Sequence, residues 1–200
     1  MTRGVMSARL AAAVATAMLV ASALLLGGCA GPGSGPYEPR SEAQRNTTRA
    51  EALNRDAAEL IGSDDEGAEK LLREALTEDL FFGPAHNNLG VVFLGQGKLY
   101  EAAAEFEWAR KLMPGHPDPR VNLALCMEQA GRVDDALESY EAALQVWPEY
   151  LPAVQGIARA TVRARREDPR MARWLEVIAM QGEDEGWRGW AREHGARTER

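Results

Sequence analysis

An internal repeat constrains the fold of this chain more than any other feature. Residues 83–116 align with residues 117–150 over their whole length without a gap. Asn-Leu-Gly at residues 88–90 corresponds to Asn-Leu-Ala at residues 122–124. Repeats of about 20–50 residues are typical of solenoids, in which a unit buries its apolar face only against its neighbours. We therefore expect the chain to form a row of stacked units.

Each unit is predicted to be a pair of helices. Apolar or small residues recur at helical spacing in two stripes, which indicates two amphipathic helices. In the first copy the stripes are His86, Leu89, Gly90 and Phe93, and then Ala102, Phe106 and Ala109. Gly97 lies between them, where a residue with positive φ is needed to end a helix. Pro114 follows the second stripe and stops that helix.

These positions resemble the tetratricopeptide repeat. The family pattern requires Leu-Gly and Tyr in the first helix, then Ala, Phe, Ala and Pro at fixed offsets. In the second copy these slots hold Leu123, Ala124, Met127, Ala136, Tyr140, Ala143 and Pro148. Only the position that holds Trp in the family pattern differs: it is occupied by His86 in the first copy and Arg120 in the second. The resemblance implies an all-α fold, an α-solenoid of stacked helix-turn-helix hairpins.

Two weaker copies flank the clear ones, at about residues 49–82 and 151–184. In the first, Arg55 and Glu59 occupy apolar slots, and the register of its first helix stays open. In the last, Arg165 stands where Gly is expected. A final helix at residues 184–194 is expected to cap the stack.

That final helix carries Trp187 and Trp190 at a spacing of i, i+3, which suits the cover of an apolar end. The repeat domain is therefore predicted over residues 42–196. Asp168-Pro169 is expected to supply the N-cap and first residue of the second helix in the last unit.

The N-terminal residues predict export. Residues 1–28 have two early arginines and an uncharged apolar run from Leu10 to Leu26, typical of a signal peptide. Leu26-Gly27-Gly28-Cys29 resembles the lipobox of bacterial lipoproteins. The resemblance implies a covalent lipid on Cys29, with residues 29–41 as a lipidated Gly/Pro-rich tether. The alternative is an uncleaved membrane anchor, for which this run has only the minimum length.

Composition excludes several classes of function. The formal net charge of −7 argues against a nucleic-acid binder, which needs a basic face. Two cysteines and three scattered histidines offer no spacing for a metal site. No nucleophile motif or phosphate-binding loop is present, so we expect no catalytic residues, no metal and no cofactor other than the lipid on Cys29.

In tetratricopeptide proteins the first helices line a concave groove that takes a peptide or helix. The resemblance places eight residues on this groove: Asn87, Asn88, Val91, Leu94, Val121, Asn122, Leu125 and Glu128. The aliphatic members suggest an apolar partner segment. Alternatively, the chain fills the groove with its own residues 30–48 or its C-terminal helix.

The asparagines have two interpretations. Asn54, Asn88 and Asn122 follow one another at the period of the repeat. An amide both donates and accepts, so a row of them suits the backbone of an extended peptide, as in some family members. The other interpretation, which we favour, is hydrogen bonding between neighbouring helices.

These observations lead to one functional expectation. The protein is expected to be a monomeric, non-catalytic adaptor lipoprotein, anchored to the outer membrane and facing the periplasm of a bacterial envelope. It would bind a peptide or helix of a partner protein, in pilus or secretion assembly. The alternatives are a cell-wall enzyme or its accessory subunit, and a self-assembling structural envelope protein.

Overall fold

A computed structural model describes residues 45–182 and 184–198 of the chain. All of them lie in one compact unit, Pro39–Arg200. The predicted signal peptide, the tether at 29–41 and the lipidation site Cys29 lie outside the described residues.

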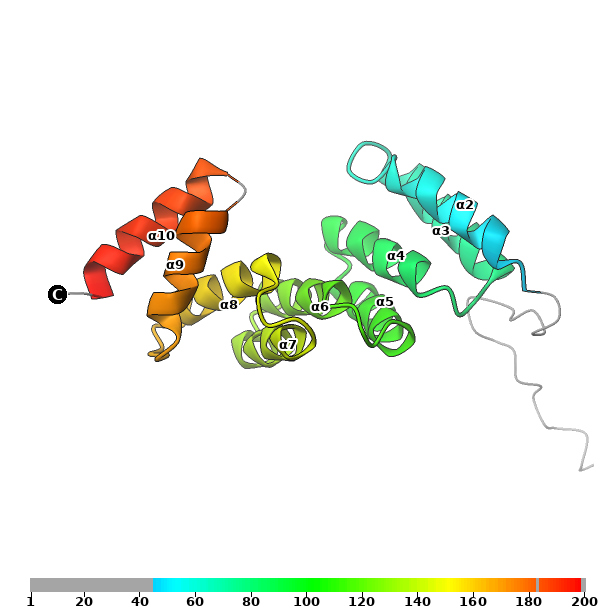
Figure 1. Ribbon diagram of the computed structural model, residues 1–200. Coiled ribbons are helices and arrows are strands. Elements are labelled where there is room, and N and C mark those ends of the chain that lie inside the picture. Colours follow the sequence, from blue (N-terminus) through cyan, green and yellow to red (C-terminus); the bar gives the residue numbers. More distant parts are fainter. Residues whose placement is uncertain (1–44, 183, 199–200) are drawn as a thin grey trace, which may run out of the picture. The chain divides into compact units, whose positions relative to one another are not determined.

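Within the described part, every regular element is a helix (Figure 1). Nine helices follow one another: α2 Thr47–Ala58, α3 Asp65–Glu78, α4 Gly83–Gly95, α5 Leu99–Leu112, α6 Asp118–Gln129, α7 Val133–Val146, α8 Leu151–Arg163, α9 Met171–Gln181 and α10 Glu185–Thr198. The first eight form four hairpins: α2 with α3, α4 with α5, α6 with α7, and α8 with α9. The all-α class is confirmed.

The hairpins stack in sequence order, as a solenoid requires. Each second helix packs against the first helix of the next unit: α3 on α4, α5 on α6 and α7 on α8. The first helices also contact one another along the row, from α2 through α4 and α6 to α8. Helix α10 packs on α9. The predicted α-solenoid with a terminal helix is therefore confirmed.

One backbone conformation recurs in the turn between the two helices of every unit. Gly62, Gly97 and Gly131 have φ values of +83°, +73° and +73°. In the last unit the same place is taken by Arg165, with φ of +53°. The left-handed conformation agrees with the prediction made from Gly97, and a side chain other than glycine in it stores strain.

The structure determines the register of the first unit, which the sequence had left open. In α2 the buried residues are Ala50, Leu53 and Ala57, with the same mutual spacing as His86, Leu89 and Phe93 of α4. This helix is therefore displaced by two positions from the alignment that the repeat period gives. Helix α2 ends at Ala58, and a longer turn absorbs the difference before α3 begins at Asp65.

Small residues on one helix leave room for large aromatic rings on the helix packed against it. A Cβ atom on Gly90 would lie 2.5 Å from the Phe106 ring of the same hairpin. A Cβ on Gly156 of α8 would lie 2.2 Å from the ring of Tyr140 in α7. Both rings are fully buried. At Gly90, the absence of a side chain leaves room for an aromatic ring of the second helix.

His86 fills the Trp slot as a core residue, as predicted. Its side chain is 2% exposed. Nδ1 lies 2.6 Å from a carboxylate oxygen of Glu105, and Nε2 lies 2.8 Å from the carbonyl oxygen of Leu80. Its ring stacks on Trp108 at 5.8 Å. Hydrogen bonds on both nitrogens explain how a polar ring is tolerated there.

Helix starts agree with the sequence in one place and differ in another. Asp64 caps α3 by accepting a hydrogen bond from the Gly67 amide at 3.0 Å, and it begins the acidic run Asp-Asp-Glu, whose negative charge is favoured at the start of a helix. Asp168 was expected to be the N-cap of α9, which is wrong. That helix begins at Met171, because Asp168 accepts from the amide of Arg170 and forms a turn before it.

Candidate functional site

The predicted groove residues lie on α4 and α6, the first helices of the two clear repeats. Val91 and Leu94 on α4 and Leu125 on α6 are half-buried, so part of each aliphatic side chain faces solvent. Since α4 contacts α6, these three side chains belong to adjacent helices. All three are half-buried aliphatic residues on two helices that contact each other, and we call them the aliphatic strip.

Val121 was predicted on the same surface, and the structure contradicts this. Only 6% of it is exposed, and it belongs to the core cluster that contains Ala153, Val154 and Ile157 of α8. The close packing of α6 against α8 covers this position. Val121 therefore stabilises the stack and does not line a groove.

The asparagines bond across neighbouring first helices. The Asn88 amide nitrogen donates to the side-chain oxygen of Asn54 at 2.9 Å. Asn122 donates in the same way to Asn87 at 3.0 Å. These bonds agree with the interpretation favoured from the sequence. They leave each half-buried amide group with unused donors or acceptors, because an amide has four hydrogen-bonding sites.

Glu128 has a different environment from the other predicted groove residues. Its side chain is only 7% exposed. It accepts a hydrogen bond from the Tyr140 hydroxyl at 2.8 Å and bonds the guanidinium of Arg159. A second guanidinium, that of Arg163, lies 3.5 Å from its other oxygen. A carboxylate this buried needs such partners, so Glu128 primarily joins α6, α7 and α8.

The same contacts shift the pKa values of the neighbours. Burial, with the adjacent charge of Glu128, raises the pKa of Tyr140 well above its ordinary value. For Arg159, burial acts to lower the pKa, but the hydrogen bonds and charges of Glu128 and Tyr140 together outweigh it and the pKa is raised. Tyr140 therefore stays neutral and Arg159 stays charged across the physiological range.

The first helices of the four units can be aligned by their buried residues. In this alignment, one position next to the buried residues can be compared in all four helices. From α2 to α8 it holds Arg55, Val91, Leu125 and Arg159. The two central residues are aliphatic, and the two ends are cationic. Arg55 is 70% exposed and Arg159 31% exposed at their side chains. The sequence reasoning missed both arginines, because the first unit had no secure register and the last was degenerate.

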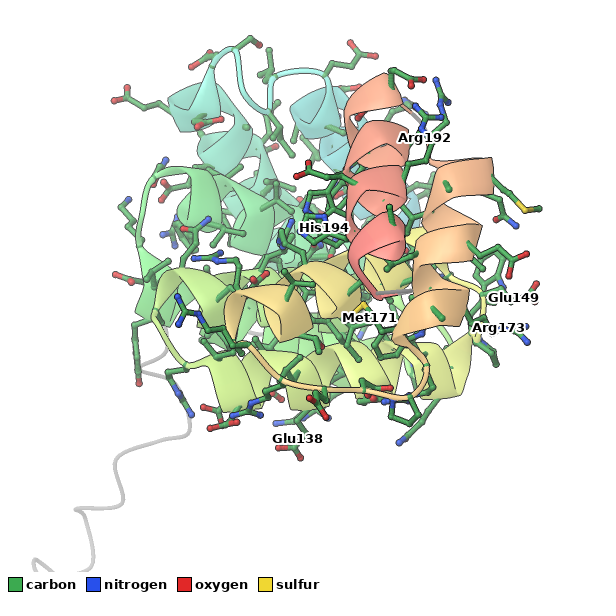
Figure 2. The ribbon with its side chains drawn as sticks, turned by 90° about the vertical axis from the view of Figure 1, so that its left-hand side faces the viewer. Glu138, Glu149, Met171, Arg173, Arg192 and His194 are labelled. Atoms are coloured by element: carbon green, nitrogen blue, oxygen red, sulfur yellow. The ribbon has the colours of Figure 1, made fainter. Side chains whose placement is uncertain are left out.

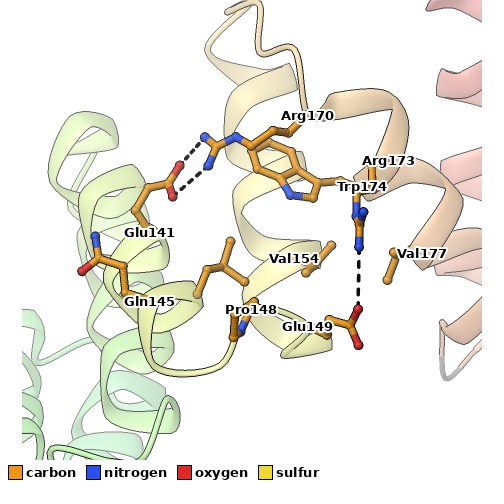
Figure 3. A pocket seen from close by; sticks show the side chains of 10 residues that line it. Glu141, Gln145, Pro148, Glu149, Val154, Arg170, Arg173, Trp174 and Val177 are labelled. Atoms are coloured by element: carbon orange, nitrogen blue, oxygen red, sulfur yellow. Dashed lines mark hydrogen bonds and ion pairs between the residues drawn. The ribbon is translucent and has the colours of Figure 1, made fainter.

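A separate cleft of about 350 Å³ lies between α7 and α9 (Figure 3). Its apolar lining includes Leu144, Val154 and Trp174. The Glu149–Arg173 pair, at 3.7 Å, lies at its rim, and both of its side chains are more than two-thirds exposed (Figures 2 and 3). No sequence motif predicted this cleft.

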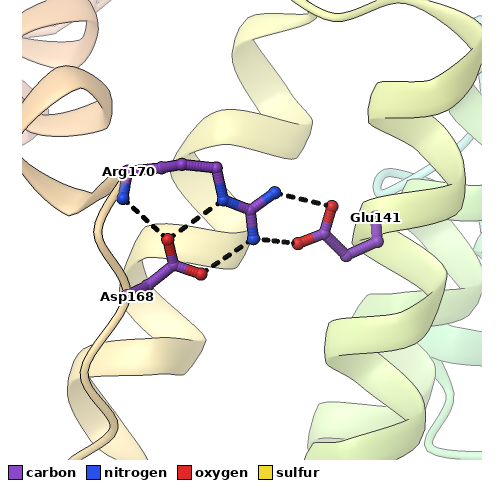
Figure 4. Close-up of polar contacts among 3 residues, drawn as sticks. All are labelled: Glu141, Asp168 and Arg170. Atoms are coloured by element: carbon purple, nitrogen blue, oxygen red, sulfur yellow. Dashed lines mark hydrogen bonds and ion pairs between the residues drawn. The ribbon is translucent and has the colours of Figure 1, made fainter.

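Arg170 joins the cleft wall to the preceding turn (Figure 4). Its guanidinium bonds both carboxylate oxygens of Glu141 and both of Asp168. The bond from Arg170 lowers the pKa of Asp168, while the two carboxylates raise that of Arg170. These partners satisfy the guanidinium internally, so the contact fixes α9 against α7.

The residues that the structure describes contain neither a group of metal ligands nor a membrane-spanning helix. Among residues 45–182 and 184–198, His, Cys, Asp and Glu side chains nowhere form a group of three that could hold a metal ion. In the same residues, no helix has the length and apolar character needed to cross a membrane. Cys126 is 1% exposed, and burial raises the pKa of its thiol.

Comparison with known proteins agrees with this geometry. Residues 87–150 match the tetratricopeptide repeat family model. The described helices have the tetratricopeptide-repeat fold. No curated protein matches the chain in sequence.

Three solved structures illustrate the likeness in fold. The first tetratricopeptide domain of Spaghetti (RPAP3), bound to an HSP90 peptide, is 12% identical, with a TM-score of 0.57; the match covers 61% of this chain and 98% of that one. MamA is 20% identical, with a TM-score of 0.56, over 64% and 70% of the two chains. The O-GlcNAc transferase of Thermobaculum terrenum is 23% identical, with a TM-score of 0.59, over 71% of this chain but only 26% of that one.

Proposed function

We propose that this protein is a non-catalytic adaptor that binds a segment of a partner protein along its first helices. The observation that carries the proposal is the aliphatic strip of Val91, Leu94 and Leu125, which stays partly exposed on adjacent helices. Aliphatic side chains gain free energy when a partner removes them from water, about 25 cal/mol per Å² of apolar area. A strip that crosses two adjacent helices suits a helix or an extended peptide as its ligand.

Solved structures of similar fold support the binding of a peptide. The first tetratricopeptide domain of Spaghetti was solved with an HSP90 peptide, and the second such domain of human RPAP3 with an HSP70 peptide. In this chain, the half-buried amides of Asn87 and Asn122 lie on the same helices as the strip. Their unused hydrogen-bonding groups could bond a partner's backbone while the strip takes its side chains.

The proposal includes a place in the cell. A lipid on Cys29 would anchor the chain to a bacterial envelope membrane, with the outer membrane and the periplasmic side as our choice. Several acyl chains hold a protein stably where one does not. An anchored adaptor would localise its partner at the membrane, and pilus or secretion assembly is the process we propose. We propose a monomer, which sedimentation at several concentrations would test.

The anchor has a direct test. A Cys29→Ala variant should lose incorporation of radiolabelled palmitate in growing cells and accumulate as precursor. Continued labelling would refute lipidation at Cys29, without bearing on the adaptor function.

The binding surface is tested by affinity capture from crosslinked bacterial envelopes. The bait is the chain with Val91→Glu and Leu125→Glu, compared with wild type. The matched control, Ala104→Glu with Gln145→Glu, adds the same charge at exposed positions of α5 and α7. We expect the first variant to lose the captured partner and the control to keep it, both with unchanged helical circular dichroism. Equal capture by all three proteins would reject the aliphatic strip as the site.

A further inference from the structure

One face of α8 carries hydrogen-bond donors in a row. Gln155, Arg159 and Arg163 are spaced i, i+4, i+8 and therefore share a face of this helix. Arg159 occupies the position equivalent to Val91 and Leu125, so this donor face continues the aliphatic strip on the next first helix. Since α6 contacts α8, the two features adjoin.

The charge on this face is not balanced. Two guanidinium groups, those of Arg159 and Arg163, share one carboxylate, that of Glu128. The three together carry one net positive charge. The neighbouring Arg166 is paired with Asp134, so it neither cancels nor adds to that charge.

The two arginines differ in how firmly they are held. Arg159 bonds Glu128, lies 3.3 Å from the Tyr140 hydroxyl, and has its guanidinium 5.8 Å from the centre of the Trp187 ring. Arg163 is 69% exposed and reaches Glu128 only at 3.5 Å. Arg159 is therefore part of the framework, and Arg163 has donors available for another group.

A hollow lies beside Arg163. It has a volume of about 130 Å³ and is lined by Glu128, Val133, Ala160, Arg163 and Ala164. Its walls are apolar apart from the charged pair of Glu128 and Arg163. Gln155, two turns earlier on the same face, has a buried amide nitrogen with no acceptor among the described residues. Both features favour an acceptor rather than a donor as the ligand.

We infer that the α8 end of the binding surface receives a carboxylate, so that the partner segment carries aliphatic residues for Val91, Leu94 and Leu125 followed by an acidic residue for Arg163. This inference rests on the proposed function and specifies the partner's chemistry. An acidic side chain would bond the remaining guanidinium donors of Arg163 in the hollow, while Arg163 keeps its contact to Glu128. Glu128 keeps its bonds to Tyr140 and Arg159, so the framework is unchanged.

The test begins with selection from a phage library of random dodecapeptides on the immobilised full chain, purified in detergent. Peptides retained by wild type but not by the Val91→Glu, Leu125→Glu variant define ligands of the strip. We expect them to share aliphatic residues and an Asp or Glu at a fixed spacing. One such peptide is then synthesised with its acid, and again with the acid replaced by the matching amide.

Affinities of both peptides are measured for wild type, Arg163→Gln and Arg163→Lys. Arg163→Gln should weaken the acidic peptide by about fivefold and leave the amide peptide unchanged, in the range of a partly exposed charged hydrogen bond. Arg163→Lys should retain most of the preference for the acid. The control Arg173→Gln removes an exposed arginine of α9 and should change neither affinity.

The outcomes separate the two claims. The inference is overturned if the retained peptides share no acidic residue, or if the Arg163→Gln variant still prefers the acidic peptide to the amide peptide. In either case the proposed peptide binding is not affected. If no peptide distinguishes wild type from the Val91→Glu, Leu125→Glu variant, the proposed function itself fails, and the inference fails with it.

Discussion

The contact between Gly156 and Tyr140 makes Gly156→Ala a sharp test of the packing. The added Cβ would lie 2.2 Å from Cε1 and 2.4 Å from Cζ of the Tyr140 ring. The ring cannot simply turn away, because its hydroxyl bonds Glu128 and the side chain is fully buried. Either α8 moves from α7 or the hydroxyl leaves Glu128.

The magnitude follows from three opposing effects. Overpacking costs about 1–3 kcal/mol. Loss or weakening of the hydrogen bond to the Glu128 carboxylate costs up to about 1.5–3 kcal/mol. The greater helix propensity of alanine than of glycine stabilises the folded state by about 1 kcal/mol. We expect Gly156→Ala to lower the free energy of unfolding by about 2–3 kcal/mol, and Tm by about 5–10 °C.

Urea unfolding followed by circular dichroism measures the change, and α10 supplies the control. A Cβ on Gly189 would meet nothing within 4 Å, so Gly189→Ala should stabilise the chain by about 0.5–1 kcal/mol through helix propensity alone. In a Tyr140→Leu background, Gly156→Ala should cost less than about 1 kcal/mol, since the clashing ring is gone. If Gly156→Ala proved as stable as wild type, the ring would not lie against α8 as described.

Three further predictions concern single residues. Arg165→Gly should raise the free energy of unfolding by about 0.5–1 kcal/mol, because glycine adopts positive φ without strain; a decrease in urea midpoint would contradict the left-handed turn. Asp168→Asn should destabilise the chain by about 1 kcal/mol at neutral pH. The folded pKa of Asp168 is depressed, so its contribution is present above its unfolded pKa and lost as pH falls through the folded one; the difference between variant and wild type should therefore vanish in acid, and a difference independent of pH would refute this. Cys126 should react with a thiol reagent at a rate set by unfolding, and rapid labelling of the native chain would contradict its burial.

The sequence by itself determined the class of fold and the two central hairpins. The period of the repeat, the small residues at Gly90 and Ala102 and the stops at Gly97 and Pro114 act locally, through helix geometry and backbone conformation. Local chemistry of this kind can be read from a single chain. The cap at Asp64 and the core position of His86 were predictable for the same reason.

Only the tertiary structure decided which residues of the predicted site are available to a partner. Val121 and Val91 are both valines of the predicted groove, yet α8 covers Val121, whereas Val91 on α4 stays partly exposed. Glu128 was predicted as a groove residue, but it is held between Tyr140 and Arg159, which lie 12 and 31 residues further along the chain. Such exposure and pairing depend on how consecutive hairpins stack, and the energies involved arise between segments that no local pattern connects.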